Sequence, residues 1–258
     1  MIYSRIYSKI DDFLPKEQGG FRKNRSCCDQ VLDLTTYIER GFQERKKTGV
    51  VFMDLTAAYD TVWKNGLLLK LYKTLKCSQT VKLIEEMLSN RKFRVFLGEK
   101  SSKIQTLNNG LPRGAVLSPL LFNLYTQDIP NTNSRKFIYA DDIAIATQDE
   151  HFQNLNTTLS EDVKILYDFF RNWRLTPNPS KTTTSCFHLN NRNKQTELNI
   201  FYNGTRLKHN HKPTYLGVTL DTSLTYNSHS EKLKQKLKTR NNLIHNFAGT
   251  IWGANASI

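Results

Sequence analysis

The stretch Phe137-Ile-Tyr-Ala-Asp-Asp-Ile-Ala144 places two adjacent acids, Asp141 and Asp142, between two short apolar runs. These runs, 137–139 and 143–146, predict a tight β-hairpin that carries both carboxylates at its turn. Adjacent carboxylates at the end of a dry strand pair repel each other and are costly to desolvate. Asp is common in turns, so a solvated turn is the plain alternative. The apolar flanks favour instead a site for a hard divalent cation, which prefers such oxygen ligands.

A third acid, Asp54, ends the apolar run Val50–Met53, which predicts a buried strand. Carboxylate oxygens suit magnesium. Two such ions about 4 Å apart would activate an attacking hydroxyl and stabilise a leaving pyrophosphate. The three acids therefore predict a site for two Mg²⁺ ions, with Mn²⁺ as the alternative.

The remaining periodicities predict a mixed α/β (α+β) chain. Helices are expected over 30–45, 67–75, 80–88 (with Ser78 as N-cap), 118–129 (with Ser118 as N-cap and Pro119 first in the helix), 155–173 and 229–247. Hairpin arms are expected at 93–97 and 103–107, and further strands at 201–202, before an Asn-Gly turn, and at 215–220.

The charge balance concerns the partners of the chain. The chain has 37 Lys and Arg against 23 Asp and Glu, a net charge of +14. This surplus favours nucleic acid as the first candidate partner and an anionic membrane surface as the second. No apolar run approaches the roughly 20 residues of a membrane span, and residues 1–10 lack a signal-peptide core. We therefore expect an intracellular protein, nuclear or cytoplasmic. Its cysteines lack zinc-ligand spacing and are expected to be reduced thiols: Cys27, Cys28, Cys77 and Cys186.

Several motifs together resemble those of reverse transcriptases. The stretch at 137–144 resembles their Tyr-X-Asp-Asp motif, and 51–63 their first carboxylate motif. Segment 109–125 resembles their template–nucleotide loop and helix. Further similarities are the fingers motif at 18–26, the lysine of the fourth palm motif at Lys181 and the primer grip at 215–221. Their order, over about 15–222, and the tail at 238–253 most resemble polymerases of jockey-type retrotransposons that lack long terminal repeats.

The resemblance implies a right-hand polymerase fold. Its expected parts are partial fingers (1–48), a palm with an antiparallel sheet backed by helices (49–222) and a partial thumb (223–258). The palm would include a fingers insertion at about 66–108 and the primer grip at about 213–221. Both ends are shorter than in the family, so we expect a partial copy that alone is a poor enzyme.

The resemblance also implies roles for individual residues. Asp54 and Asp141 would be the principal metal ligands, and Asp142 would complete the acidic site. The Leu55 carbonyl would add a backbone ligand. Lys181 would donate a proton to the leaving pyrophosphate, or it is an ordinary solvated lysine. The remaining contacts would be made to the triphosphate by the amides of Ala57 and Ala58, and to primer and template by Gly114, Tyr215, Leu216 and Gly217.

Tyr59 holds the position of an aromatic steric gate, which would exclude a ribose 2′-hydroxyl; without the motif it would be an ordinary core tyrosine. Arg113 departs from the family, which usually has glutamine there, and its charge changes the geometry of any nucleotide contact. Arg22 and Arg25 are expected to contact the triphosphate or template, or to be surface cations. Asp60 is expected to be structural, as a cap or in a local salt bridge.

The implied function is RNA-directed DNA polymerase in retrotransposition, with an RNA template, a DNA primer and deoxynucleoside triphosphates as partners. The basic helix at 229–247 would follow a duplex backbone through phosphate contacts, with Leu233, Leu237 and Ile244 left to pack. One alternative is an RNA-dependent RNA polymerase, which the aromatic Tyr59 disfavours. The other is an inactive retroelement remnant that only binds nucleic acid, which the intact acids disfavour and Arg113 favours.

Overall fold

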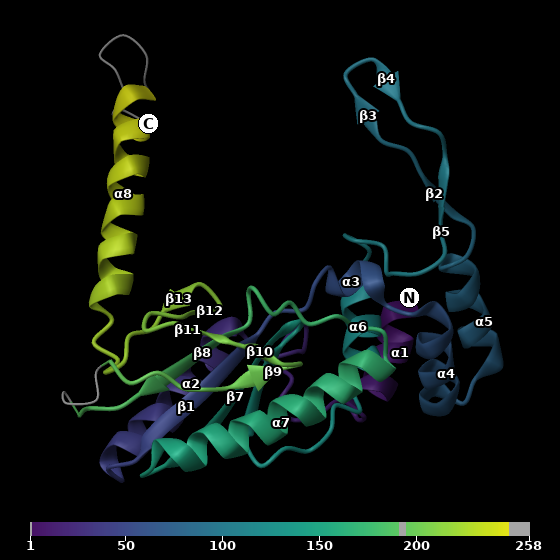
Figure 1. Cartoon of the computed structure of the whole chain (residues 1–258). Coiled ribbons are helices and arrows are strands. Elements are labelled where there is room, and N and C mark those ends of the chain that lie inside the picture. Colours follow the sequence, from purple (N-terminus) through teal and green to yellow (C-terminus); the bar gives the residue numbers. More distant parts are fainter. Residues whose placement is uncertain (1, 191–194, 248–258) are drawn as a thin grey trace.

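A five-stranded sheet forms the centre of the computed structural model, which describes residues 2–190 and 195–247 (Figure 1). The strand order is β11-β8-β1-β7-β6. All neighbouring pairs are antiparallel except β11 with β8. The strands are β1 (Lys47–Met53), β6 (Arg135–Tyr139), β7 (Asp142–Asp149), β8 (Thr183–Phe187) and β11 (Lys208–His209). The expected α+β class is confirmed.

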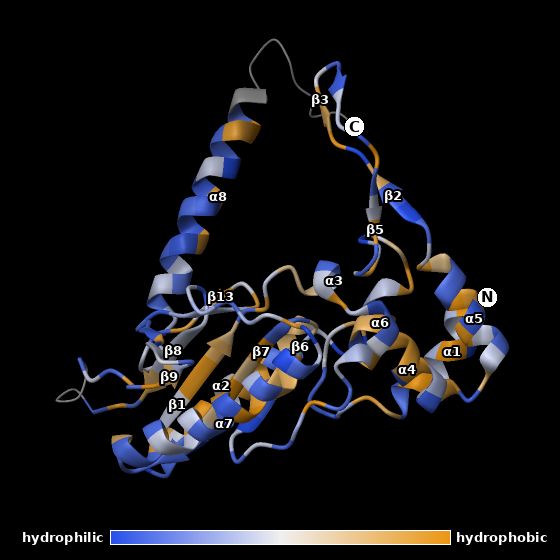
Figure 2. Ribbon diagram, turned by 45° about the vertical axis from the view of Figure 1, so that its right-hand side comes forward, coloured by the Kyte–Doolittle hydropathy of each residue, from blue (hydrophilic) through white to orange (hydrophobic). Residues whose placement is uncertain are grey.

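Helices cover both faces of this sheet. Helix α7 (Phe152–Asn172) lies on one face, where Val51 and Met53 of β1 join its core. Helix α2 (Cys27–Gln43) lies on the other, where Val50 and Phe52 join a second core. Successive side chains of a strand point to opposite faces, so a strand covered on both faces is apolar at every position. This explains the uninterrupted run at the end of β1, which appears orange in Figure 2.

A group of short helices adjoins one end of the sheet. They are α1 (Ile2–Asp11), α3 (Ala58–Thr61), α4 (Lys64–Leu75), α5 (Ser78–Met87) and α6 (Ser118–Tyr125). The caps predicted for two of them are wrong, because α5 is preceded by Cys77 as N-cap and α6 by Leu117. The hydroxyl of Ser118 donates instead to the carbonyl of Pro112, 2.6 Å away. It therefore ties the preceding loop to the helix.

Two arms project from the same side of this body (Figure 1). One is a long hairpin, as predicted, although its pairing is split into two ladders: β2 (Arg91–Phe93) with β5 (Gln105–Leu107), and β3 (Phe96–Leu97) with β4 (Lys100–Ser101). The other is α8 (Asn227–Phe247). The expected packing of its apolar residues is wrong, since Leu233, Leu237 and Ile244 are 48%, 49% and 63% exposed. The helix stands away from the body.

Two small hairpins complete the described part of the chain. β9 (Phe201–Tyr202) and β10 (Thr205–Arg206) join through the predicted Asn203-Gly204 turn. The single strand predicted over 215–220 is wrong. It is a hairpin of β12 (Thr214–Tyr215) and β13 (Val218–Thr219), with positive φ of 46° and 85° at Leu216 and Gly217. Two successive left-handed residues turn the chain back at once.

Two further expectations concern the membrane and the tail. The described part of the chain contains no helix that is long and apolar enough to cross a membrane. The tail segment 249–253, which contributed to the family resemblance, lies outside the described residues.

Candidate active site

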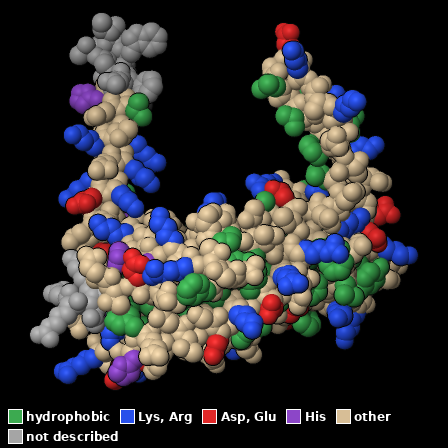
Figure 3. Space-filling model, in the orientation of Figure 1, with side chains coloured by type: hydrophobic (Ala, Val, Ile, Leu, Met, Phe, Trp, Pro, Cys, Tyr) green, Lys and Arg blue, Asp and Glu red, His purple; other side chains and the backbone are tan. Residues whose placement is uncertain are grey.

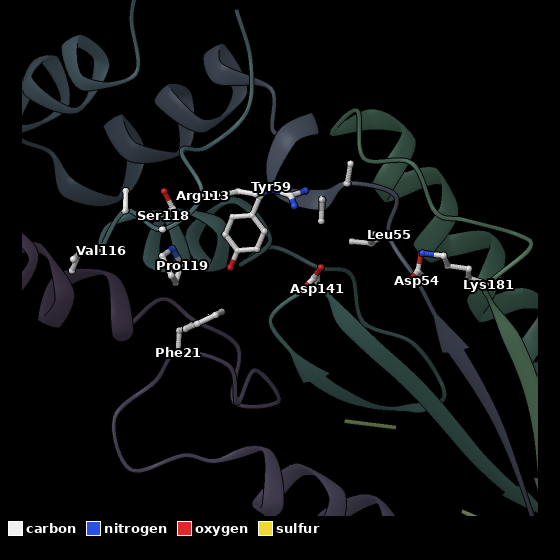
Figure 4. Close-up of a pocket in the computed structure, with 14 residues that line it drawn as sticks. Phe21, Asp54, Leu55, Tyr59, Arg113, Val116, Ser118, Pro119, Asp141 and Lys181 are labelled. Atoms are coloured by element: carbon white, nitrogen blue, oxygen red, sulfur yellow. The ribbon is translucent and has the colours of Figure 1, made fainter. Parts of the chain in front are cut away.

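A cavity of about 680 Å³ lies where the sheet meets α3 and α6 (Figure 4). Most of the predicted site residues line it, although their positions in the sequence are far apart. They are Asp54, Leu55, Ala57, Ala58, Tyr59, Arg113, Gly114, Asp141 and Lys181. Phe21, Val116 and Pro119 also line the cavity, although none of them was predicted as a site residue.

The sheet register brings the acids together. β1 pairs with β7 so that Met53 lies opposite Ile143, which puts Asp54, the next residue, beside the start of β7. β6 and β7 pair from Tyr139 and Asp142 onward, so Ala140 and Asp141 form the turn. Asp54 and Asp141 line the main cavity. Asp142 lines a smaller neighbouring cavity of about 130 Å³, which shares Asp54 and Lys181 with the first.

The charges of Asp54 and Asp141 act on the third acid, Asp142. Desolvation by the surrounding protein raises the pKa of Asp142, and the charges of Asp141 and Asp54 raise it further. Bringing a cation to this point would relieve both effects, since an opposite charge favours the ionised carboxylate.

The carboxylates fit a hard divalent cation in an open site, where the protein supplies only some of the ligands. Among the residues that the structure describes, no group of three or more acids, histidines or cysteines is arranged so that it could hold a metal ion by itself. Mg²⁺ is commonly bound through one or two carboxylates, with waters and substrate phosphates as the other ligands. Asp54 and Asp141, which line one cavity, are suited to such a partial ligand set.

Lys181 lies beside the first acid. Its Nζ is 3.9 Å from Oδ2 of Asp54, and its side chain is 68% exposed. The loop that carries it is fixed to the strand end, because the amide of Asn178 donates to the Asp54 carbonyl at 2.7 Å. The Asp54 amide donates in turn to Oγ1 of Thr182 at 3.4 Å. These bonds hold the lysine near the acid, and its side chain is largely exposed to solvent.

Tyr59 forms a wall of the cavity. Its ring stacks on Phe122 of α6, with 4.7 Å between ring centroids and 17° between planes. Its hydroxyl is buried and has no hydrogen-bond partner in the described part of the chain. Burial raises the pKa of this hydroxyl, and the nearby charge of Asp141 raises it further. Figure 4 shows the ring between Arg113 and Asp141. A buried hydroxyl without a partner is costly, so this group weakens the folded state.

Ala57, the N-cap of α3, and Ala58, the first residue of α3, line the cavity. Ala57 has a left-handed φ of 46° and precedes the first turn, and Ala58 is buried. The first amides of a helix have no partner within that helix. Both alanines line the cavity, but Ala57 is exposed whereas Ala58 is only 3% exposed.

Arg113 is held at the rim by Asp60. Its Nη2 lies 2.6 Å from Oδ2 of Asp60, and its Nε donates to Oδ1 at 3.2 Å. This two-point contact matches the fork of a guanidinium to a carboxylate, and it confirms the local salt bridge expected for Asp60. Both side chains are exposed, at 69% and 53%. The adjacent Gly114 has φ of +82°, a conformation in which a side chain would be strained.

The two fingers-motif arginines are not brought to the cavity. Nε of Arg22 lies 2.8 Å from Oδ1 of Asp11, and its Nη1 donates to the Pro15 carbonyl at 3.0 Å. Arg25 donates to the Lys16 carbonyl at 2.6 Å and lines a different pocket. Both arginines are therefore engaged within their own segment.

The predicted primer-grip residues lie at the smaller cavity. Tyr215 and Leu216 line it together with Asp142. The Tyr215 ring packs against Phe52, and its hydroxyl donates to the Phe137 carbonyl at 3.3 Å. Gly217 lies at the exposed tip of the β12–β13 turn. The hairpin is thus anchored to the central sheet next to the acids.

The surface is hollowed between the two arms, and α3 lies at the base of this hollow (Figures 1 and 3). The exposed cations of α8 flank it: Lys232, Lys234, Lys236, Lys238 and Arg240. The hairpin opposite carries Lys92, Arg94, Lys100 and Lys103, which are also exposed. The hollow above the cavity is therefore bordered by positive charge on two sides.

Comparison with known proteins identifies the family. The model of the family described as reverse transcriptase (RNA-dependent DNA polymerase) matches residues 1–220. The chain is 31% identical over 252 residues to the RNA-directed DNA polymerase from mobile element jockey of Drosophila funebris, covering 93% of this chain and 27% of that protein. It is 33% identical over 225 residues to the probable RNA-directed DNA polymerase from transposon BS of Drosophila melanogaster, covering 84% and 25%. The chain thus spans about a quarter of the length of these relatives.

Solved structures show the same fold. A telomerase from Candida tropicalis in complex with a fragment of telomeric RNA superposes with a TM-score of 0.59 at 10% identity, covering 88% of this chain and 36% of that one. An apo form of that telomerase, truncated from its C-terminal domain, gives 0.57, with 88% and 44% covered. The expected right-hand polymerase fold, with a palm-like sheet backed by helices, is confirmed. The chain belongs to the reverse transcriptase family, with relatives among jockey-type retrotransposons that lack long terminal repeats.

Proposed function

We propose that this chain carries the polymerase site of an RNA-directed DNA polymerase that acts in retrotransposition. The reaction is attack of a primer 3′-hydroxyl on the α-phosphate of a deoxynucleoside triphosphate, opposite an RNA template. The observation that carries the proposal is the shared cavity of Asp54, Asp141 and Tyr59. Two acids and an aromatic wall in one cavity offer both metal ligands and a surface that senses the sugar.

Two Mg²⁺ ions, or Mn²⁺ in their place, would be held by Asp54 and Asp141, with Asp142 and the Leu55 carbonyl as further ligands. When bound, such ions lower the pKa of an attacking hydroxyl and offset the charge of the leaving pyrophosphate. The chain's own groups then orient the triphosphate. Lys181 would place a positive charge next to the leaving pyrophosphate and would donate a proton to it. The amides of Ala57 and Ala58 would donate hydrogen bonds to the triphosphate oxygens.

The hollow between the arms would hold the template–primer duplex. Cations on both sides would contact phosphates without distinguishing sequence, so this binding weakens as salt rises. We assign the hairpin to the fingers insertion (66–108), α8 to the beginning of a thumb (223–258), residues 1–48 to the fingers and 49–222 to the palm. The β12–β13 hairpin, with Tyr215 beside Asp142, would carry the primer terminus.

The second candidate is a protein that binds nucleic acid without copying it. Arg113 favours it, because the family usually has glutamine at this position. A single experiment separates the two. Purified chain is given an RNA template, a labelled DNA primer and Mg²⁺, with Asp141→Ala as the matched control. We expect extension by the unmodified protein and none by the variant, with equal binding of template–primer because phosphate contacts dominate affinity. Extension by Asp141→Ala would refute the assignment, and binding without extension by either protein would support the second candidate.

A further inference from the structure

The side chain of Gln18 contacts the turn that carries Asp141. Gln18 is 2% exposed. Its Oε1 accepts hydrogen bonds from the amides of Ala140 and Gly20, both at 2.8 Å. Its Nε2 donates to the carbonyl of Ala140 at 3.3 Å. One amide side chain therefore satisfies both backbone polar groups of the residue immediately before Asp141.

The segment around Gln18 is itself fixed along the edge of the sheet. β6 is the last strand in the sheet order, and Gln18 forms a parallel bridge with its residue Ile138. The Gly19 amide donates to the Ile138 carbonyl at 2.7 Å, and the Ile138 amide to the Glu17 carbonyl at 3.3 Å. The glutamine thus approaches the turn from a rigid base.

Close packing allows only a glycine beside it. A Cβ placed on Gly20 would lie 2.3 Å from the Ala140 amide nitrogen, a distance that backbone atoms cannot accommodate. The Gly20 carbonyl accepts from Nδ2 of Asn123, a buried residue of α6, at 2.7 Å. The fingers motif, the Asp141 turn and α6 are therefore joined through one buried hydrogen-bond network.

The turn needs such support. Ala140 has φ of 57°, a left-handed conformation that non-glycine residues adopt only where their surroundings hold them. In a two-residue turn this dihedral angle determines where the next side chain points. Only a side chain that both donates and accepts, at the length of glutamine, can bind the amide and the carbonyl of Ala140 together.

We infer that Gln18 is a positioning residue: its amide clamps Ala140 in the left-handed conformation and so directs the Asp141 carboxylate into the cavity. The inference deepens the proposed function and rests on it for the role of Asp141. It gives the glutamine of the fingers motif a task within the palm, 122 positions away in the sequence.

The test compares Gln18→Met, which keeps the length and removes both polar groups, with Gln18→Glu, which keeps only the acceptor. Gln148→Met is the matched control. Its Nε2 also donates to a backbone carbonyl, that of Tyr37, but from the stretch of β7 far from the Asp141 turn. Amide hydrogen exchange is followed by mass spectrometry in peptides that cover 137–142 and in the rest of the sheet.

We expect faster exchange at 137–142 in Gln18→Met and unchanged exchange there in Gln148→Met. Gln18→Glu should show a smaller increase, because it keeps the acceptor for the Ala140 amide and loses the donor to the Ala140 carbonyl. In primer extension, kcat of Gln18→Met should fall on the order of ten- to a hundredfold, as for a misplaced catalytic group. The KM for nucleotide should stay close to that of Gln148→Met. Unchanged exchange at 137–142 in Gln18→Met would overturn the inference, whatever happens to activity. If the unmodified protein extends no primer, the proposed function fails, and the exchange measurement alone still decides whether the clamp exists.

Discussion

Replacing Tyr59 tests whether the wall of the cavity selects the sugar. If the ring excludes a ribose 2′-hydroxyl by its volume, Tyr59→Phe should keep the selection and Tyr59→Ala should lose it. The two changes also differ in stability for reasons visible in the structure. The hydroxyl is buried without a partner in the described part of the chain, so its removal leaves no acceptor unpaired. The ring stacks on Phe122, so its removal leaves a void.

The magnitudes follow from these contacts. An unsatisfied buried polar group costs about 1–3 kcal/mol, so Tyr59→Phe should be as stable as the unmodified protein or more stable. Truncating a fully buried aromatic ring to alanine costs about 3–5 kcal/mol of stability. The loss of an aromatic pair such as Tyr59–Phe122 accounts for about 0.5–1.5 kcal/mol. Because the Tyr59 ring is only half-buried, about 2 kcal/mol is the expected loss for Tyr59→Ala. That loss leaves a folded protein of ordinary stability to be assayed.

The assay measures kcat/KM for a deoxynucleotide and for the matching ribonucleotide with each protein. A site that rejects an added hydroxyl by shape alone discriminates by about a hundredfold. We expect Tyr59→Ala to lose most of such a factor and Tyr59→Phe to lose none. An unchanged ratio in Tyr59→Ala would remove Tyr59 from this role. An equal loss in both variants would show that the hydroxyl, and not the ring, senses the sugar.

Three further predictions concern other parts of the molecule. Arg113→Gln should lower the rate of incorporation and Arg113→Gln with Asp60→Asn should restore it, both measured by single-nucleotide extension. Burial lowers the pKa of Lys70 to about 8 from its ordinary 10.5. The unfolded chain therefore holds this proton to higher pH, and the free energy of unfolding should rise from about pH 8 to pH 10.5. Lys70→Met should flatten that rise, as measured by urea midpoints. Lys236→Ala should weaken template–primer binding on any sequence and reduce the slope of log K against log salt by about 1, as read by fluorescence anisotropy.

Local patterns predicted much of the fold. The spacing of Leu155, Leu159, Val163 and Leu166 predicts one face of α7, and all four are buried against the sheet. The apolar run before Asp54 and the runs around Asp141 predict β1, β6 and β7, because strands covered on both faces carry their signal locally. The acids then lie close together at one end of the sheet, because each of them stands at the end of one of these neighbouring strands.

What failed depended on contacts that residue type and spacing do not encode. Ser118 has the residue type and position of an N-cap, but its hydroxyl bonds the carbonyl of Pro112, and only the path of the loop decides this. The stretch 215–220 has the composition of one strand, yet Leu216 and Gly217 take left-handed conformations and turn the chain back, next to a Tyr215 whose hydroxyl is anchored on the central sheet. The contact of Arg22 with triphosphate or template stays a prediction, and its pairing with Asp11 is a contact that its motif did not indicate.

The pairing of Arg113 with Asp60 changes how the departure from the family should be interpreted. An arginine in place of glutamine seemed to add a positive charge to a nucleotide site. The structure places the Asp60 carboxylate within 2.6 Å of that charge, so the pair as a whole adds none. Both side chains are exposed, and such pairs contribute at most about 1 kcal/mol to stability, so the fold does not require the pair. Substituting glutamine alone would leave Asp60 unpaired at the rim, where it would repel an incoming triphosphate. Because arginine and aspartate balance each other here, Arg113 is weak support for an inactive remnant, and the double substitution is the decisive comparison.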